Sequence, residues 1–369
     1  MNEQQPVDPR LINLSPFGLR VEGLDCANAD LQTLTHLGQL LAEHEVLVIP
    51  DQGHLTPADE VFFNRALAPC ADTVWRDQRH NPWEVFKVQQ GNTAGTWQIP
   101  DNPGVLVIGK GRYVANGLDV ELGGNRRAYG HQQGSQVLGG GALQWHIDGE
   151  FYRHEPCRVG QMRCLEAPTS RLQRIEYWDG NSFECMTGAT VFVSGRKALS
   201  ALTPDQTELC FNLTAHYAAH PFRRVMHLGN SDSGLRVLQD ESQKDLDDSN
   251  ESQVDKHSKS YPVVWKCPQT DQGALMIHPR CLLNLEDNRD GKRESTQGSR
   301  MLAEELMQPG IRSDQIYIHN WQPGDLVIWN NFSVWHSATG GLNATDRRVM
   351  HLTAFNGLHS PERADRALL

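Results

Sequence analysis

The chain has 369 residues, of which 38% are hydrophobic and 21% are charged, so it is long enough to bury a sizeable core. The net charge is -11 and the basic residues are scattered, so nucleic acid is not expected as a partner. No run of about 18 apolar residues occurs, and residues 1–10 are too polar for a signal peptide. We therefore expect a cytoplasmic location and no membrane partner.

The eight cysteines contain no C-x-x-C pair, so a zinc ribbon has no support in the sequence. Without a secretory signal, they are expected to be reduced thiols.

The first half of the chain predicts two helices around a strand. Residues 30–45 carry leucines at a spacing of three and four, which is typical of an amphipathic helix. The apolar, largely β-branched run 46–49 follows at once and indicates a buried strand. A second helix is expected over residues 56–68, because Thr56 can cap its start and Pro57 suits the first helical position.

Short strands dominate the rest of the chain. Strands are predicted at 105–108, 157–165, 187–194 (after a turn), 261–266, 316–319, 325–329 and 349–353, and helices at 198–202, 204–209 and 299–307. Many short strands between Gly and Pro turns, with a few helices, predict a mainly β core with flanking helices in one domain.

Two stretches have unusual compositions. Residues 117–141 are rich in Gly, Asn, Gln and Arg, and they form either a surface loop or a rim over a site, since they lead directly to His146. Residues 231–260 are acidic and poor in apolar side chains, so they cannot bury enough surface to fold alone. They form an insertion or a lid, and an insertion is the preferred interpretation.

His146 and Asp148 are the first candidate site residues. In an extended strand, residues i and i+2 project from the same face, so an imidazole and a carboxylate would lie side by side. Two histidines and one carboxylate with open positions form the metal site of non-haem Fe(II) oxygenases. His-x-Asp alone is a weak signal, so a third ligand must come from elsewhere in the chain.

A candidate for the third ligand lies late in the chain. Pro323 and Gly324 form a predicted turn, and the following strand is expected to carry His336 near its end. Arg348 follows on the next strand, beside Arg347, and an arginine presents a planar fork that suits a carboxylate.

Taken together, these segments resemble the taurine dioxygenase (TauD/TfdA-like) superfamily of Fe(II)- and 2-oxoglutarate-dependent dioxygenases. The resemblance covers most of the chain, and several segments in the right order are more specific than any one of them. They are Glu45–Gln52 with Leu55-Thr-Pro57, Trp145-His-Ile-Asp148 with Phe151, Gly188-Ala-Thr190, Pro323-Gly-Asp325 with Trp329, Asn331 and His336, and Arg347–His351.

The resemblance implies roles for individual residues. His146, Asp148 and His336 would bind Fe(II), with O2 as the other substrate. Arg348 would hold the C5 carboxylate of 2-oxoglutarate with help from Thr190, while Arg347 would point to the opposite face.

The resemblance also implies a fold and a reaction. The fold would be a double-stranded β-helix, a jelly-roll-like barrel, formed by a single domain over residues 1–369 with insertions near 110–141, 166–187 and 229–260. The reaction would hydroxylate or desaturate a small organic metabolite and release succinate and CO2. Because Asp148 is present, where related halogenases lack the carboxylate, chlorination is not expected.

One departure from the family pattern bears on the substrate. Members that use sulfonates or sulfates carry another arginine where this chain has Leu352, which argues against a taurine-like substrate. Leu352 and Phe151 are therefore candidate substrate contacts. An anionic substrate group would need another cation, for which Lys110, Arg112, Arg126 and Arg127 are candidates.

Two alternative functions stay open at this point. One is a zinc-dependent or other metal-dependent hydrolase or cupin-like enzyme, although such an enzyme needs no keto-acid clamp of Arg348 and Thr190. The other is a non-catalytic jelly roll that binds small molecules, although such a protein needs no spaced metal ligands. Whether the protein forms homo-oligomers is also open.

Several other side chains are more simply explained by structure than by function. Trp145 and Trp335 are expected to pack beside the ligands, and His351 to be packed on the face opposite Arg348. The remaining histidines considered are expected to be surface or hydrogen-bonded core residues: His131, His154, His216, His220, His227 and His278.

Overall fold

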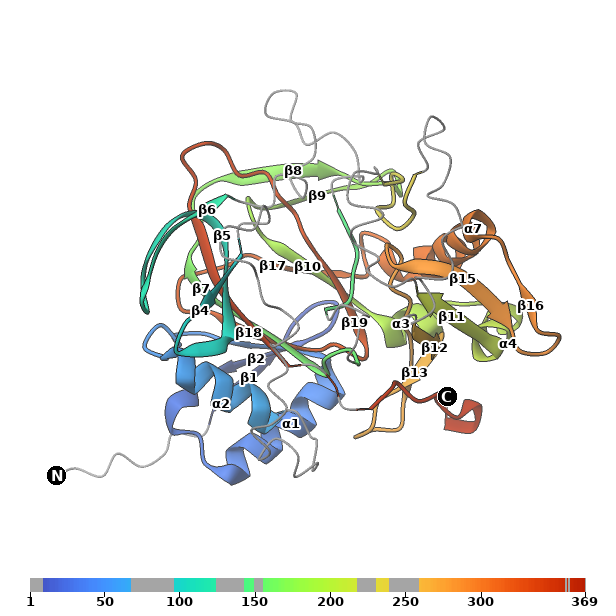
Figure 1. Cartoon of the computed structure of the whole chain (residues 1–369), viewed down its shortest axis with the longest axis horizontal. Coiled ribbons are helices and arrows are strands. Elements are labelled where there is room, and N and C mark those ends of the chain that lie inside the picture. Colours follow the sequence, from blue (N-terminus) through green and yellow to red (C-terminus); the bar gives the residue numbers. More distant parts are fainter. Residues whose placement is uncertain are drawn as a thin grey trace.

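Two sheets and a lobe of mixed helices and strands make up the architecture, seen in the computed structural model (Figure 1). The structure describes residues 9–67, 96–123, 143–148, 155–217, 230–238, 259–355, 357 and 359–368. Over these residues the protein is mainly β with few helices, as predicted. None of the helices among them is long and apolar enough to cross a membrane.

The larger sheet combines strands from both ends of the chain. Its nine strands follow the order β1-β2-β3-β18-β7-β20-β5-β4, and β6 pairs with β5 outside this path. The bounds are β1 (Arg10–Asn13), β2 (Leu19–Glu22), β3 (Val46–Ile49), β4 (Trp97–Ile99), β5 (Asn102–Ala115), β6 (Leu118–Gly123), β7 (Val159–Glu166), β18 (Leu326–Asn330) and β20 (Arg348–Ala354). Because β3 pairs with β18, the sheet forms only when distant parts of the chain meet.

The smaller sheet faces the larger one. It has three antiparallel strands in the order β17-β10-β19, namely β17 (Ile316–His319), β10 (Thr190–Ser194) and β19 (Val334–Ala338). One hydrophobic cluster contains Met162, Trp329 and Met350 from the larger sheet together with Phe192 and Val334 from the smaller. The two sheets therefore pack against each other through their inner faces.

Two helices cover the outer face of the larger sheet (Figure 1). They are α1 (Leu31–His44) and α2 (Pro57–Leu67), which confirms both predicted helices. The carboxylate of Asp30 accepts a hydrogen bond from the N–H of Thr33, and the hydroxyl of Thr56 accepts one from the N–H of Asp59. These caps satisfy backbone donors at the helix starts, which is why the helices begin where they do.

A second lobe extends from the sheets, on the right in Figure 1. It contains α3 (Gly195–Ser200), α4 (Pro204–Asn212), β11 (Leu213–Tyr217), β12 (Lys259–Pro262), β13 (Val264–Lys266), β14 (Gly273–Leu275), β15 (Leu282–Asp287), β16 (Lys292–Arg293) and α7 (Thr296–Met307). Helices α3 and α7 begin earlier than predicted, because the side chains of Ser194 and Ser295 cap them.

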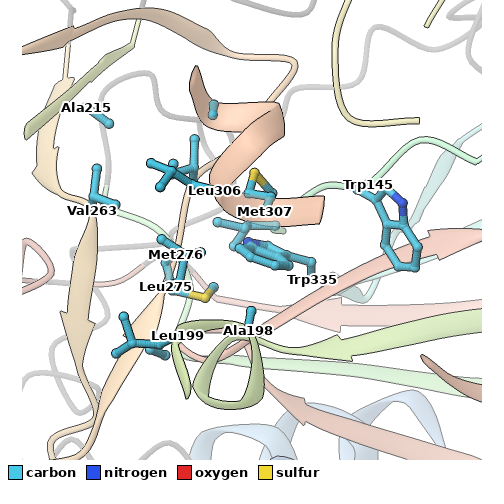
Figure 2. Packing of buried hydrophobic residues seen from close by; sticks show 14 of the residues in the cluster. Trp145, Ala198, Leu199, Ala215, Val263, Leu275, Met276, Leu306, Met307 and Trp335 are labelled. Atoms are coloured by element: carbon cyan, nitrogen blue, oxygen red, sulfur yellow. The ribbon is translucent and has the colours of Figure 1, made fainter. Parts of the chain in front are cut away.

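The hydrophobic core of this lobe reaches the predicted metal ligands. Figure 2 shows Leu275, Leu306 and Met307 of the lobe in the same cluster as Trp145 and Trp335. Both tryptophans have no exposed surface, which confirms that they pack beside the histidines they flank. The lobe therefore fixes the outer side of the segments that carry the candidate ligands.

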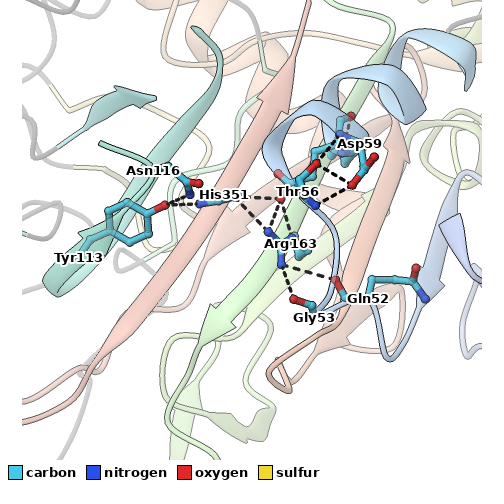
Figure 3. Close-up of polar contacts among 10 residues, drawn as sticks. Gln52, Gly53, Thr56, Asp59, Tyr113, Asn116, Arg163 and His351 are labelled. Carbon is cyan, nitrogen blue, oxygen red and sulfur yellow. Dashed lines mark hydrogen bonds and ion pairs between the residues drawn. The ribbon is translucent and has the colours of Figure 1, made fainter. Parts of the chain in front are cut away.

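A buried polar network lies between α2 and the outer face of the larger sheet (Figure 3). The Glu60 carboxylate accepts hydrogen bonds from Arg163 (2.6 Å) and contacts Nδ1 of His351 (2.9 Å). Nε2 of His351 lies 3.1 Å from the Tyr113 hydroxyl, which accepts a hydrogen bond from Asn116 (2.6 Å). His351 is thus packed on the face opposite Arg348, as predicted.

The regions predicted to be loops or insertions contain unpredicted hairpins. Strand β5 is longer than the predicted 105–108, and it pairs with β6, so residues 118–123 of the expected 117–141 loop form a strand. Residues 172–186 form a hairpin of β8 (Leu172–Glu176) and β9 (Ser182–Met186). Residues 124–142 and most of the acidic stretch, 239–258, lie outside the described residues.

The cysteines of the described residues are all buried and not in disulfides. Burial raises the pKa of the Cys164 thiol to about 12, because a thiolate is poorly solvated there. Cys70 lies outside the described residues.

Candidate active site

Three side chains from two distant segments converge on one point. The ligand atoms of His146, Asp148 and His336 all lie within 4.8 Å of one another. Nε2 of His336 is 3.4 Å from Oδ1 of Asp148, and Nε2 of His146 is 3.9 Å from the same oxygen. The predicted grouping of the three residues is therefore present in the structure.

Backbone pairing brings the two segments together. His146 and His336 form an antiparallel bridge, in which each N–H donates to the other's carbonyl at 3.0 Å. His336 is not near the end of the strand after Gly324, as the sequence predicted, but in the middle of the separate strand β19. The chain turns after Asn330, whose side chain accepts a hydrogen bond from the N–H of Phe332.

The electrostatics of His146 and Asp148 suit a bound cation. Burial and the nearby His336 lower the pKa of His146 to about 4, which keeps its imidazole neutral. Burial alone would raise the pKa of Asp148, but the neighbouring histidine rings hold it below its usual value. A neutral imidazole and a carboxylate anion are the protonation states in which His146 and Asp148 can bind a divalent metal.

A hydrogen bond orients the His146 ring toward the site. Nδ1 of His146 lies 2.8 Å from the carbonyl of Gln144, so Nδ1–H donates there and Nε2 is left to face the site. Oδ2 of Asp148 is buried and has no hydrogen-bond partner among the described residues. A buried, unsatisfied carboxylate oxygen beside two imidazole nitrogens fits a metal ion in the two-histidine, one-carboxylate arrangement.

Arg348 and Thr190 form a second polar group on the inner face of the sheets. Arg348 is 6% exposed, its Nε donates to the carbonyl of Gly188 (2.8 Å), and its guanidinium lies 3.5 Å from the Thr190 hydroxyl. Gly188 has a φ of +76°, and a Cβ there would lie 2.9 Å from Cδ of Arg348. A side chain at this position would therefore displace the arginine.

The two adjacent arginines face opposite sides of β20, as predicted. Arg347 is exposed and forms an ion pair with Glu166 at 2.5 Å. Arg348 points between the sheets, where its guanidinium reaches the sulfur of Met162. This confirms the predicted register of the strand.

Strand β10 connects the arginine group to the metal ligands. Phe192 pairs with His336 across the smaller sheet, and the two rings stack with centroids 5.9 Å apart. Thr190 lies two residues earlier on the same face of β10, which corresponds to about 7 Å along a strand. A short dicarboxylate can therefore span from the metal ligands to Arg348.

Trp321 is a site residue that the sequence did not identify. Its indole N–H donates to the Thr190 hydroxyl (3.0 Å), and the tryptophan is almost fully buried. The motif around Pro323 pointed to this segment, but nothing in the local sequence indicated which side chain would reach Thr190.

His278 is a second residue whose position was not predicted. It lies between β14 and β15 of the lobe, is fully buried, and its ring centroid is 6.4 Å from that of His146. Burial and the nearby His146 lower the pKa of His278 well below its usual value. The sequence predicted a surface or hydrogen-bonded core histidine, and it did not predict that His278 lies beside the metal ligands.

The candidate substrate contacts have mixed outcomes. Leu352 is partly buried and packs against the cluster between the sheets, on the same face as Arg348. Arg112 is exposed and bonded to Asp119, so the structure does not bring it to the site. Lys110 bonds to the carbonyl of Asn343, while Phe151, Arg126 and Arg127 lie outside the described residues.

The comparisons with known proteins agree with this geometry. The model of the family described as "Taurine catabolism dioxygenase TauD, TfdA family" matches residues 10–354. The α-ketoglutarate-dependent xanthine dioxygenases xan1 of Schizosaccharomyces pombe and xan-1 of Neurospora crassa are 25% and 26% identical to this chain. Each alignment covers 94% of this chain, and 86% and 84% of the two relatives, respectively.

Solved structures show the same fold. The crystal structure of AAD-2 in complex with Mn(II) and N-oxalylglycine superimposes with a TM-score of 0.59 at 15% identity, covering 96% of this chain and all of that one. The family match spans most of the chain, including both candidate ligand segments and Arg348. The chain therefore belongs to the taurine catabolism dioxygenase TauD, TfdA family.

Proposed function

We propose that this 2-oxoglutarate-dependent dioxygenase holds Fe(II) on His146, Asp148 and His336 and oxidises a small organic metabolite that is not a sulfonate. The observation that carries the proposal is the grouping of three ligand atoms within 4.8 Å, beside a buried arginine that reaches Thr190 on β10, the strand paired with β19. When bound, iron and 2-oxoglutarate supply the oxidising chemistry, in which O2 is consumed and succinate and CO2 are released.

Arg348 and Thr190 orient the co-substrate in this proposal. The planar guanidinium fork binds the C5 carboxylate, and the threonine hydroxyl donates to the same group. The offset of about 7 Å between Thr190 and His336 along the smaller sheet then leaves the keto-acid end beside the metal ligands. The relative AAD-2, solved with Mn(II) and N-oxalylglycine, supports a site of this kind.

The fold proposed for this chemistry is a double-stranded β-helix. Two facing sheets with the ligands at one side support it. Trp329 and Phe192 pack around His336, with ring centroids 4.9 Å and 5.9 Å away, and exclude water from that ligand. The absence of disulfides among the described cysteines supports a cytoplasmic location as part of the same proposal.

The substrate of this proposal is a small metabolite without a sulfonate. Leu352 occupies the inward position four residues after Arg348, and an aliphatic side chain there offers no partner to a buried anion. The xanthine dioxygenases among the relatives support a small, non-sulfonate substrate. The reaction outcome is hydroxylation or desaturation.

An anaerobic titration tests the metal and co-substrate together. Fe(II) added to the protein with 2-oxoglutarate is expected to produce a charge-transfer band in the visible range, and neither component alone should do so. A zinc hydrolase or a non-catalytic jelly roll would give no such band.

A metabolite screen tests the substrate class. Succinate formation is expected to rise with a non-sulfonate metabolite and not with taurine or alkyl sulfates. Robust taurine-dependent succinate release would contradict the proposed substrate class while leaving the metal site intact.

A further inference from the structure

One side chain outside the metal ligands bonds both backbone groups of Asp148. Asn331 has no exposed surface and lies in the turn between β18 and β19. Its Oδ1 accepts a hydrogen bond from the N–H of Asp148 (2.9 Å), and its Nδ2 donates to the carbonyl of Asp148 (2.7 Å). A single carboxamide thus bonds Asp148 as a neighbouring strand would.

The remaining hydrogen of the amide is also used. Nδ2 of Asn331 donates to the carbonyl of Cys157 (2.8 Å) and lies 3.3 Å from its sulfur, while that thiol contacts the carbonyl of Asp148 (3.6 Å). A rotated amide would place an oxygen against two carbonyls and a nitrogen against an N–H. Only one orientation of Asn331 therefore satisfies all its neighbours.

The Asn331 contacts extend the pairing that His336 begins. The backbone of His146 is bonded on both sides by the backbone of His336. Two residues later, the backbone of Asp148 is bonded on both sides by the Asn331 side chain. One stretch, 331–336, therefore supplies one metal ligand and fixes the main chain of the other two.

We propose that Asn331 is a positioning residue that sets the carboxylate of Asp148 relative to the two histidines. It touches neither substrate nor metal and acts through the Asp148 backbone. The inference rests on the proposed metal site, because it concerns the geometry of one of its ligands. Partners that orient a ligand in this way typically change metal affinity by about 10- to 100-fold when removed.

The experiment measures Co(II) binding to the full chain by its visible absorption, without any turnover. Asn331→Ala removes all three hydrogen bonds, and Asn331→Asp keeps the size but replaces the donor with a carboxylate oxygen. Both are expected to weaken Co(II) binding by about 10- to 100-fold and to alter the Co(II) spectrum. Far-UV circular dichroism of the metal-free protein should stay unchanged.

Asn330→Ala is the matched control. Asn330 is the neighbouring buried asparagine, and its amide contacts Cys267 and Phe332 instead of the metal segment. The Asn330→Ala variant should bind Co(II) with an affinity within about twofold of the wild type. If a general loss of turn stability weakened metal binding, this variant would also bind more weakly. If Asn331→Ala does not fold, the isosteric Asn331→Asp decides the question by itself.

The outcomes separate this inference from the proposed function. Wild-type Co(II) affinity and spectrum in both Asn331 variants would overturn the positioning role and leave the metal site standing. Wild-type Co(II) affinity in Asp148→Ala would overturn the metal site and the positioning role with it. A wild type that binds Co(II) but does not consume 2-oxoglutarate would overturn the proposed function only.

Discussion

Two groups of buried polar side chains contain similar residue types but differ in function: one lies between α2 and strands β7 and β20, and the other joins residues 146–148 to β19. On the outer face, the Glu60 carboxylate is bonded to the Arg163 guanidinium and to His351, at distances of 2.5–2.9 Å. On the inner side of the sheets, the Asp148 carboxylate faces the rings of His146 and His336 at 3.4–3.9 Å.

The difference lies in how charge is compensated. The outer group contains a carboxylate and a guanidinium in direct contact, so it is close to neutral without any ligand. Each group has one buried carboxylate oxygen without a hydrogen-bond partner among the described residues, Oε2 of Glu60 and Oδ2 of Asp148. In the metal group, however, the ion-pair partners of the carboxylate within the described part of the chain are two imidazoles and not a guanidinium, and the pKa of His146 is lowered to about 4, mainly by burial. A self-compensated group indicates a structural role, whereas a group that lacks a cation indicates a binding site.

The largest expected effect comes from removing a metal ligand. Asp148→Ala, His146→Ala and His336→Ala should each lower 2-oxoglutarate-dependent succinate formation by more than about 100-fold, since changes to the residues around ligands already cost about 10- to 100-fold. The free energy of unfolding of the metal-free Asp148→Ala protein should not fall, because the substitution removes a buried, unsatisfied carboxylate. Urea denaturation and a succinate assay measure the two quantities. Near-normal succinate formation in any variant would remove that residue from the ligand set.

In the outer group, we expect a substitution to lower the stability of the protein and to leave metal binding unchanged. Arg163→Ala leaves the Glu60 carboxylate buried without its guanidinium, and we expect the free energy of unfolding to fall by about 3–5 kcal/mol. Co(II) affinity of the folded fraction should stay within about twofold of the wild type.

A double replacement is the control for this effect. Arg163→Met with Glu60→Gln removes both charges, and it should recover most of the lost stability because no charge stays buried alone. A double variant as unstable as Arg163→Ala would show that shape, not charge compensation, distinguishes the outer group.

In both groups, the relative positions of residues close in the sequence could be predicted, whereas contacts between residues far apart in the sequence could not. The alternation of side chains along a strand was sufficient to place His146 beside Asp148 and Arg348 opposite Arg347. The position of His278 depends on how the lobe docks on the sheets, which no local pattern encodes. Asn331 appeared only as part of a motif, because its bonds to Asp148 cross 183 residues of chain.

The hairpin of β5 and β6, which the sequence did not predict, has a similar explanation. Strand β5 continues through Gly109 and Gly111, which break the apolar alternation on which strand prediction depends. Gly109 has a φ of +125°, and a Cβ there would lie 1.8 Å from the carbonyl oxygen of Arg348. The glycine is required by the neighbouring strand, so the feature that hid the strand is a consequence of its pairing.

An intermediate effect is expected for the co-substrate arginine. Arg348→Ala should raise the KM for 2-oxoglutarate by about 10- to 100-fold, because hydrogen bonds to a charged group contribute about 1.5–3 kcal/mol. Arg347→Ala should change it by less than about twofold, since its ion pair with Glu166 is largely exposed. Steady-state kinetics with varied 2-oxoglutarate compares the two. The reverse order would place Arg347, not Arg348, at the co-substrate.

The smallest expected effect concerns the hydroxyl of Thr190. A hydroxyl has one hydrogen and two lone pairs, and both Trp321 and Arg348 direct N–H groups at this oxygen. Its hydrogen is therefore left to donate to a third group, and the carboxylate of 2-oxoglutarate is the acceptor that the proposed function supplies. Trp321→Phe removes only the indole N–H and should raise the KM for 2-oxoglutarate by about two- to tenfold.

A double-mutant cycle decides whether this effect passes through the hydroxyl. Trp321→Phe should have no further effect on KM in a Thr190→Val background, because the oxygen that received the indole N–H is already gone. Trp265→Phe is the matched control: it removes a buried indole hydrogen bond in the lobe, to the carbonyl of Pro262, and should leave the KM for 2-oxoglutarate unchanged. Equal effects of Trp321→Phe in the presence and absence of the hydroxyl would show that the tryptophan acts by packing. The group of Arg348 and Thr190 would then lack the fixed hydroxyl orientation that prepares it to bind an anion.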